Sequence, residues 1–266
     1  MTLPPRALIG MVHVQALPGS PASRLSVDQI VDIAAAEARV LAESGFDGII
    51  VENMHDRPYI HGTKPPEVVA AMTRACLAVR ESVARSQAAG RIGVQVLSGG
   101  NREALAIAAA TGCSFIRCEN FVFSHVADEG LLAEAEAGPL LRYRRSIGAE
   151  AVQVFCDIKK KHASHAITQD ISLAACAEAA EFFGANGLIV TGTATGKPTD
   201  LADVAAVRKA TTLPLLVGSG VTPDLVRPLL DAGADALIVG SWIKRDGQWT
   251  NPVDPERCRR LLAARG

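Results

Sequence analysis

Short runs rich in valine and isoleucine alternate with longer segments rich in alanine and leucine along the whole chain of 266 residues. The eight runs that we predict as strands cover residues 7–14, 48–53, 92–97, 115–120, 151–158, 187–192, 214–220 and 236–241. Between them, apolar residues recur with the spacing of amphipathic helices, as over residues 27–44 and 173–183. Eight such units in even succession predict a single (β/α)8 TIM barrel, one domain over residues 1–266.

Glycines at the ends of the predicted helices support the same arrangement, because a left-handed residue commonly stops a helix before the next strand. These glycines are Gly45, Gly90, Gly112, Gly148, Gly184 and Gly233. A doubly wound open sheet is the alternative fold. The even spacing of the eight units favours closure into a barrel.

The composition excludes several classes of protein. Hydrophobic residues make up 48% of the chain and charged residues 21%, which excludes a disordered chain. The 27 basic residues nearly balance the 28 acidic ones, so we predict no nucleic-acid partner. We also predict no membrane span, since no apolar run approaches the roughly 18 residues that such a span needs.

Cysteine and metal-ligand patterns indicate a reduced protein without a cofactor. The six cysteines show no Cys-x-x-Cys pair and no regular spacing, as expected for buried thiols in a cytoplasmic protein. The chain also lacks an HExxH motif and the GxGxxG fingerprint of nicotinamide-binding folds. We therefore predict no cofactor and no metal site from these motifs.

The alternation of side chains along the predicted strands is the most informative clue to a site. Ile116 and Cys118 are apolar and share one face of their strand, whereas Arg117 and Glu119 share the other. The apolar set must face the helices, so the polar set lies inside the barrel. Applied to three strands, this argument places inside the barrel Gln95, Arg117 and Gln153 in the middle of strands, and Glu119, Asp157 and Lys159 at the strand mouths.

Several of these polar side chains lie where strands end, and Glu52 joins them from the second strand. Carboxylates and a lysine that converge at the mouth of a barrel are typical of acid–base chemistry. The residues that we predict as catalytic are Glu52, Glu119, Asp157 and Lys159. The lysine could also act as a Schiff-base nucleophile. Lys160 or Lys161 would take its place if the strand ended earlier.

A second group is predicted to bind substrate and comprises His13, Gln95, Arg117, Asn120 and Thr191. A purely structural network is the competing interpretation, in which Arg117 pairs with Glu119, Asp157 or Glu52. A divalent metal held by those three carboxylates is a further alternative.

Glycine-rich turns after the last two strands indicate a phosphate site. Such turns let backbone N–H groups approach an anion, and loops seven and eight commonly hold a phosphate in this fold. The predicted phosphate-binding residues are Gly192, Gly218, Ser219, Gly220, Gly240 and Ser241. Loop six, residues 191–197, adds threonine hydroxyls as a third candidate anion contact.

Several motifs together resemble the BtpA/SgcQ family. They are GMVHVQALPG at 10–19, DGIIVEN at 47–53, FIRCEN at 115–120, FCDIKKKH at 155–162, LIVTG at 188–192 with TG at 195–196, VGSGV at 217–221 and VGS at 239–241. The resemblance implies a TIM barrel of the ribulose-phosphate-binding type. It also implies relatives labelled as similar to phosphoribosylanthranilate isomerase, a cyanobacterial branch associated with photosystem I, and another among sugar-uptake genes. It transfers no site residue to this chain.

These observations lead to one main hypothesis and two alternatives. The main hypothesis is an enzyme that acts on a small phosphorylated sugar or phosphoribosyl-type compound by isomerisation, aldol-type cleavage or glycosidic-bond cleavage. The alternatives are a non-catalytic factor for the biogenesis or stability of membrane complexes such as photosystem I, and a regulator that binds a phosphometabolite. Barrels of this class often associate, so we expect a homo-oligomer.

Overall fold

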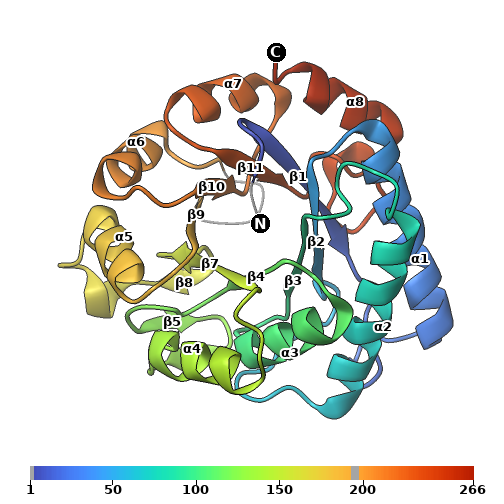
Figure 1. Ribbon diagram of the computed structural model, residues 1–266, viewed down its shortest axis with the longest axis horizontal. Helices are drawn as coiled ribbons and strands as arrows, with labels where there is room; N and C mark the ends of the chain where they lie inside the picture. Colours follow the sequence, from blue (N-terminus) through green and yellow to red (C-terminus); the bar gives the residue numbers. More distant parts are fainter. Residues whose placement is uncertain (1–2, 193–197) are drawn as a thin grey trace.

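The computed structural model describes residues 3–192 and 198–266, over which eight parallel strands form a closed barrel (Figure 1). Around the barrel the strands follow in the order β1 (Ala7–His13), β11 (Ala236–Val239), β10 (Leu215–Gly218), β9 (Gly187–Thr191), β7 (Gln153–Ile158), β4 (Phe115–Cys118), β3 (Ile92–Gln95) and β2 (Gly48–Glu52). The predicted TIM barrel is confirmed, and the open-sheet alternative is wrong.

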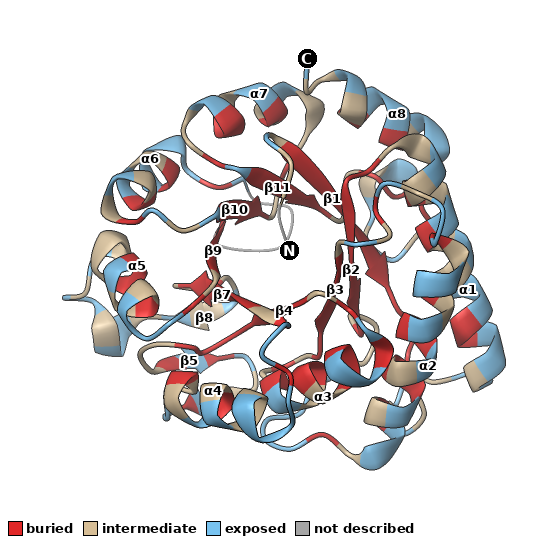
Figure 2. Ribbon diagram, in the orientation of Figure 1, coloured by how far each residue is buried: buried red, intermediate tan, exposed pale blue. Residues whose placement is uncertain are grey.

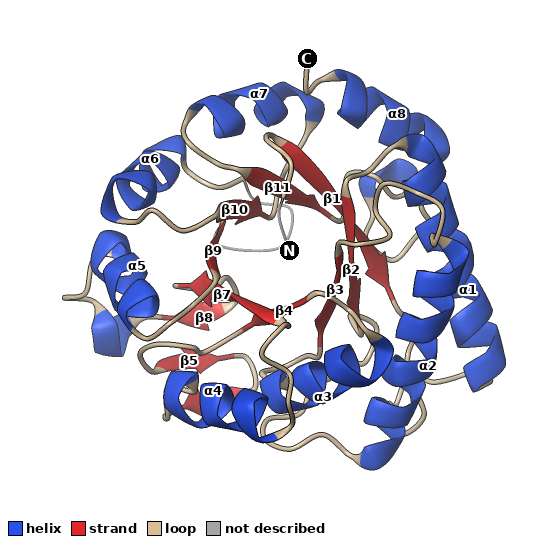
Figure 3. Ribbon diagram, in the orientation of Figure 1, coloured by secondary structure: helices blue, strands red, loops and turns tan. Residues whose placement is uncertain are grey.

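Helices surround this barrel on the outside (Figure 3). They are α1 (Val27–Ser44), α2 (Pro66–Ser82), α3 (Asn101–Thr111), α4 (Ala137–Ser146), α5 (Leu173–Phe182), α6 (Leu201–Ala210), α7 (Pro223–Asp231) and α8 (Pro255–Ala263). Two short 3-10 helices, η1 (Ala166–Thr168) and η2 (Arg245–Gly247), lie in the loops. No helix in the described ranges combines the length and the apolar character that crossing a membrane would require.

The predicted alternation of side chains separates two cores. Val94, Ile116 and Cys118 belong to the cluster between strands and helices, whereas Phe115 and Phe155 belong to a cluster inside the barrel. Figure 2 shows the buried strands within a ring of helices whose outer faces are exposed. The polar residues of the same strands therefore share the barrel interior with a layer of apolar side chains.

Two phenylalanines close the interior below the polar residues. The rings of Phe115 and Phe155 lie 5.2 Å apart between their centroids, and both are buried. A Cβ added to Gly93 would lie 2.3 Å from the ring of Phe115, and one added to Gly187 would lie 2.5 Å from that of Phe155. Glycine at these two strand positions thus makes room for the rings, which fill the barrel interior at this level.

Five of the six predicted helix-stopping glycines adopt the left-handed conformation; they are Gly45, Gly112, Gly148, Gly184 and Gly233. Gly90 does not, and the prediction is wrong there. Helix α2 ends at Ser82, eight residues earlier, and irregular turns connect it to β3. Gly90 therefore lies in the loop between α2 and β3 and does not end a helix.

A small antiparallel sheet over one side of the mouth was not predicted. It consists of β5 (His125–Ala127), β6 (Gly130–Leu132) and β8 (Ala163–Ser164), in the order β6–β5–β8. β5 and β6 come from the loop after β4, and β8 comes from the loop after β7. Main-chain pairing thus joins two loops that are separated by helix α4 and strand β7 in the sequence.

Candidate active site

Three polar side chains meet at the ends of neighbouring strands because the strand register aligns them. His13 of β1 is paired with Glu52 of β2, and Glu52 is paired with Gln95 of β3. All three are buried, with relative exposures of 5%, 7% and 2%. Gln95 therefore ends its strand and does not lie in the middle of it, and its buried Oε1 has no hydrogen-bond partner among the described residues.

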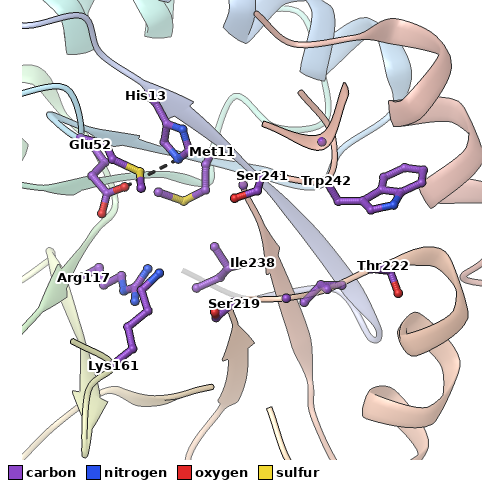
Figure 4. Close-up of a pocket in the computed structure, with 15 residues that line it drawn as sticks. Met11, His13, Glu52, Arg117, Lys161, Ser219, Thr222, Ile238, Ser241 and Trp242 are labelled. Atoms are coloured by element: carbon purple, nitrogen blue, oxygen red, sulfur yellow. Dashed lines mark ion pairs between the residues drawn. The ribbon is translucent and has the colours of Figure 1, made fainter. Parts of the chain in front are cut away.

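Two cavities open at this end of the barrel and share part of their walls. The first, which we call the serine cavity, has a volume of about 140 Å³ and is bounded by the turns after β10 and β11 (Figure 4). The second, the carboxylate cavity, has a volume of about 280 Å³ and contains Glu119 and Asp157 in its walls. Both cavities are lined by Glu52, Met54, Arg117 and Lys161.

The serine cavity contains four of the predicted phosphate-binding residues, namely Ser219, Gly220, Gly240 and Ser241. Ser219 and Gly220 have positive φ angles of 79° and 64°, which turn the chain from β10 toward the start of α7. A Cβ on Gly240 would lie 3.3 Å from Nε2 of His13. The turn thus keeps space free beside His13, next to a helix N-terminus whose dipole favours anions.

Arg117 and Asp157 form a buried ion pair between β4 and β7. Nε of Arg117 lies 3.2 Å from both carboxylate oxygens, and its NH2 group lies 3.1 Å from Oδ2. Burial opposes the charge of the guanidinium, but Asp157 and Glu52 outweigh this effect and raise the pKa of Arg117. A fixed cation therefore lies in the wall between the two cavities.

Glu119 is held as an anion by two donors. Nζ of Lys160 lies 3.1 Å from Oε1, and the N–H of Gly99 donates to Oε2 at 2.7 Å. Burial alone would raise the pKa of Glu119, but Lys160 and this N–H lower it below its usual range. Its role as a proton donor, predicted with the other carboxylates, is disfavoured by these contacts.

Glu52 and Lys161 have the opposite electrostatic character. Burial raises the pKa of Glu52, and Arg117 and Lys161 offset only part of the shift. Burial is the main cause that lowers the pKa of Lys161, and the positive charge of Arg117 lowers it further. Glu52 and Asp157 offset part of this effect. A carboxyl group with a raised pKa and an amine with a lowered pKa thus line the same two cavities, a combination that suits acid–base catalysis.

His13 is fixed in one tautomer by loop eight. Its Nδ1 lies 3.1 Å from the carbonyl oxygen of Trp249, and a carbonyl can only accept, so Nδ1 carries the proton. Burial and Lys244 lower the pKa of His13, which keeps the ring neutral. Nε2 is then an acceptor, and it faces Oε2 of Glu52 at 3.7 Å (Figure 4).

The expected pairing of Lys159 with Asp157 on one strand face is wrong. Strand β7 ends at Ile158, and Lys159 has a φ of 45°, which ends the alternation of side chains. Its ammonium donates to the carbonyl of Thr168 at 3.2 Å, away from both cavities. Lys160 and Lys161, the alternatives for an earlier strand end, line the carboxylate cavity instead.

Asn120 also lies outside the two cavities. It has a φ of 55°, and its Nδ2 donates to the carbonyl of Glu134 at 2.6 Å. It lines a different cavity of about 410 Å³, on the side of α3 and β6. The left-handed residue directly after the β4 mouth turns this side chain out of the barrel, so a direct contact with a ligand in the mouth is not supported.

The remaining predicted residues support the site from behind or lie beyond it. Oγ1 of Thr191 accepts from the main-chain N–H of Lys161 at 3.0 Å, and the carbonyl of Gly218 accepts from Thr199 at 3.2 Å. Gly192 is buried, and neither it nor Gly218 lines the serine or carboxylate cavity. The loop-six anion contact predicted beyond Gly192 falls on residues 193–197, outside the described residues.

Two of the three carboxylates that the alternative interpretation assigned to a divalent metal already have cationic partners. Asp157 pairs with Arg117 and Glu119 pairs with Lys160, which leaves Glu52 without a lysine or arginine within ion-pair distance in the described chain. Over residues 3–192 and 198–266, no group of three His, Cys, Asp or Glu side chains is arranged to hold a metal ion.

Loop eight contributes a residue that the sequence interpretation missed. Trp249 lines the carboxylate cavity, and the guanidinium of Arg57 from loop two lies 4.7 Å from the centre of its ring. The ring of His55 lies 4.9 Å from that of Trp249. The sequence did offer one indication of Trp249: the chain is poor in aromatic residues, yet both of its tryptophans follow the last strand.

Comparison with known sequences places the whole chain among relatives. Residues 5–265 match the model of the BtpA family. The mitochondrial protein F13E9.13 of Caenorhabditis elegans is 44% identical over 255 residues, which are 96% of this chain and 91% of the relative. The photosystem I biogenesis protein BtpA of Synechocystis sp. is 35% identical over 258 residues, 97% of this chain and 87% of the relative.

Comparison with solved structures supports the fold. The (S)-3-O-geranylgeranylglyceryl phosphate synthase of Thermoplasma acidophilum, in complex with its substrate sn-glycerol-1-phosphate, superposes with a TM-score of 0.59. The match covers 97% of this chain and 92% of that one, at 16% sequence identity. At this identity the likeness concerns the barrel and not the reaction.

Proposed function

The chain belongs to the BtpA family, and with this premise we propose that it is an enzyme acting on a small phosphorylated sugar or phosphoribosyl-type compound. One observation carries the proposal: the serine cavity and the carboxylate cavity share Glu52, Arg117 and Lys161. A molecule with a phosphate at one end can thus reach both an anion site and an acid–base pair.

The phosphate is proposed to lie in the serine cavity. Ser219 and Ser241 bring hydroxyl groups to it, and the glycines that follow or precede them leave the main chain accessible. The N-terminus of α7 adds a favourable dipole, and Arg117 adds a full positive charge at the boundary with the carboxylate cavity. These features suit a phosphate monoester of small size.

The chemistry is proposed to centre on Glu52 as the group that gives or takes a proton. Its raised pKa suits this task, whereas Glu119 is held as an anion by Lys160. Arg117 would stabilise negative charge that develops on a substrate oxygen. Isomerisation, aldol-type cleavage and glycosidic-bond cleavage each need such a proton transfer beside a fixed cation.

The solved structure of similar fold supports the class of ligand, because its substrate is also a small phosphate ester. The Synechocystis relative supports a different proposal, a factor for photosystem I biogenesis. That alternative needs no acid–base pair in the mouth. A regulator that binds a phosphometabolite would keep the serine cavity and not need Glu52. We also expect a homo-oligomer in the cytoplasm.

Calorimetric titration with ribose 5-phosphate, glycerol phosphates and inorganic phosphate tests the proposal, with ribose and glycerol as the matched neutral compounds. We expect heat only with the phosphorylated member of a pair. Ser241→Asp should abolish this binding by charge repulsion, whereas Ser172→Asp should not, because Ser172 is an exposed helix N-cap that aspartate serves equally well. Binding that survives Ser241→Asp would contradict the assignment.

Turnover is tested separately, by phosphorus and proton nuclear magnetic resonance of each bound compound over time. Loss of a compound that binds, catalysed by the wild type and not by Glu52→Gln, is the expected result. Tight binding without turnover of any tested compound would favour the regulator.

A further inference from the structure

Three consecutive lysines after β7 have three different environments. The amine of Lys159 donates to the carbonyl of Thr168, and that of Lys160 lies 3.1 Å from the carboxylate of Glu119. Lys161 has neither kind of partner: among the described residues no carboxylate lies within 4 Å of its Nζ, and no acceptor takes its side-chain hydrogen. Within residues 3–192 and 198–266, the amine of Lys161 is thus the one of the three without a hydrogen-bond or ion-pair partner.

The main chain positions this amine between the two cavities. The N–H of Lys161 donates to Oγ1 of Thr191 on β9, which fixes the residue at the rim of the barrel. Its side chain is half-buried and lines both the serine and the carboxylate cavity, and Figure 4 shows it extending into the pocket beside Arg117. Glu52 lines the same two cavities.

We propose that the amine of Lys161 forms an imine with the carbonyl carbon of a phosphorylated aldehyde or ketone whose phosphate lies in the serine cavity. This inference rests on the proposed function, and it narrows the substrate class from phosphorylated compounds in general to those with a free carbonyl group. Because Lys161 itself lines the serine cavity, we expect a short carbon chain between the phosphate and the carbonyl group.

Glu52 carries the proton in the formation of this imine. The lone pair of Nζ attacks the carbonyl carbon, the C=O π electrons move to oxygen, and a proton passes from nitrogen to oxygen to give a carbinolamine. Protonated Glu52 then donates to the hydroxyl, which leaves as water, and the nitrogen lone pair forms the iminium double bond. The resulting carboxylate of Glu52 is ready to remove a proton from the neighbouring carbon.

The protonation states that these steps require agree with the surroundings. Attack needs a neutral amine, and burial together with Arg117 lowers the pKa of Lys161. Loss of water needs a protonated acid, and burial raises the pKa of Glu52. The pKa of Lys160, in contrast, is raised because Glu119 outweighs the effect of burial, so its amine stays charged.

Reductive trapping with pyridoxal 5′-phosphate tests the inference without knowledge of the natural substrate, since this probe carries both an aldehyde and a phosphate. The full chain is incubated with the probe, reduced with sodium borohydride, digested and mapped by mass spectrometry. We expect the label on Lys161, loss of that label in Lys161→Arg, and an unchanged label in Lys159→Arg.

Competition separates this inference from the proposed function. Inorganic phosphate, and the substitution Ser241→Asp, should both slow labelling of Lys161 if the anion site and the amine serve one molecule. Labelling of Lys161 that neither change slows would overturn the shared site and with it the phosphate assignment. No adduct on Lys161, although calorimetry shows that phosphate binds, would overturn the imine and leave the phosphate assignment standing.

The same trapping with glyceraldehyde 3-phosphate, dihydroxyacetone phosphate and ribose 5-phosphate extends the test to small sugars. We expect an adduct on Lys161 with at least one of them, absent from the Lys161→Arg protein. Adducts spread equally over the surface lysines, with no excess on Lys161, would contradict the proposal.

Discussion

The ammonium nitrogen of Lys160 lies 3.1 Å from Oε1 of Glu119, with both side chains buried in the barrel mouth. Removing one partner leaves an uncompensated buried charge, so Lys160→Met should lower the free energy of unfolding by about 3–5 kcal/mol. Urea denaturation checks this value. Lys159→Met is the matched control and should cost about 1 kcal/mol, the usual worth of a single hydrogen bond. Equal losses in the two variants would contradict a special role for the pair.

The pH dependence of stability should reveal the same pair. The pKa of Glu119 is lower in the folded chain than its ordinary value of 4.5, so folding gains stability from its ionised form above that pH. This contribution is lost as the pH falls from 4.5 through the folded pKa. Thermal unfolding between pH 7 and pH 3 should show a smaller acid-induced loss in Glu119→Gln than in the wild type. Parallel curves would contradict the assignment.

The contribution of Glu52 to the pH dependence of stability should have the opposite sign to that of Glu119. Its pKa is raised by burial, so ionisation disfavours the folded state and stability decreases as the pH rises from 4.5 through the folded pKa. Glu52→Gln stays neutral and should therefore have a higher melting temperature than the wild type at pH 8. Its turnover should fall by about 10²–10⁴-fold if Glu52 transfers the proton. A variant that is destabilised at pH 8 and fully active would refute both statements.

The ion pair of Arg117 and Asp157 can be tested by a double-mutant cycle. Arg117→Met alone should cost about 3–5 kcal/mol, because the Asp157 carboxylate is left buried without its partner. The double variant Arg117→Met, Asp157→Leu should recover most of that loss, since an apolar pair needs no desolvation of charge. It should still fail to bind phosphate compounds, which calorimetry would detect. Retained binding would remove Arg117 from the anion site.

Trp249 should report ligand binding by its fluorescence. The chain contains two tryptophans, and Trp242→Phe leaves Trp249, in the wall of the carboxylate cavity, as the remaining indole. A phosphorylated ligand should change its emission, and Arg57→Ala should weaken binding, because Arg57 lines the same cavity and its cation–π contact holds the Trp249 ring in the wall. Unchanged emission at saturating ligand would place the ligand outside this cavity.

The strands and their inward-facing residues could be predicted because two simple periodicities determine them. Alternation along β4 was enough to place Arg117 inside the barrel and Cys118 among the helices. The same rule failed at Lys159, since alternation holds only while the backbone stays extended, and the chain adopts a positive φ at that residue. Sequence spacing carries no signal for the residue at which a strand ends.

Contacts between loops that are far apart in the sequence could not be predicted, because they depend on the folded arrangement of the chain. The tautomer of His13 depends on the carbonyl of Trp249, which is 236 residues away in the chain. Likewise, β5 and β8 are short segments whose pairing is decided by where their loops meet in space. Local propensity is weak over two or three residues, so tertiary contacts determine these parts of the site.

The sheet of β5, β6 and β8 couples the movements of two loops around the mouth. Main-chain hydrogen bonds join the loop that carries Asp128 to the loop that carries His162, and both residues line the carboxylate cavity. Displacing one loop alone would break those bonds, whereas moving the sheet as a unit preserves them. We therefore expect the two loops to move together, if they move, on this side of the mouth.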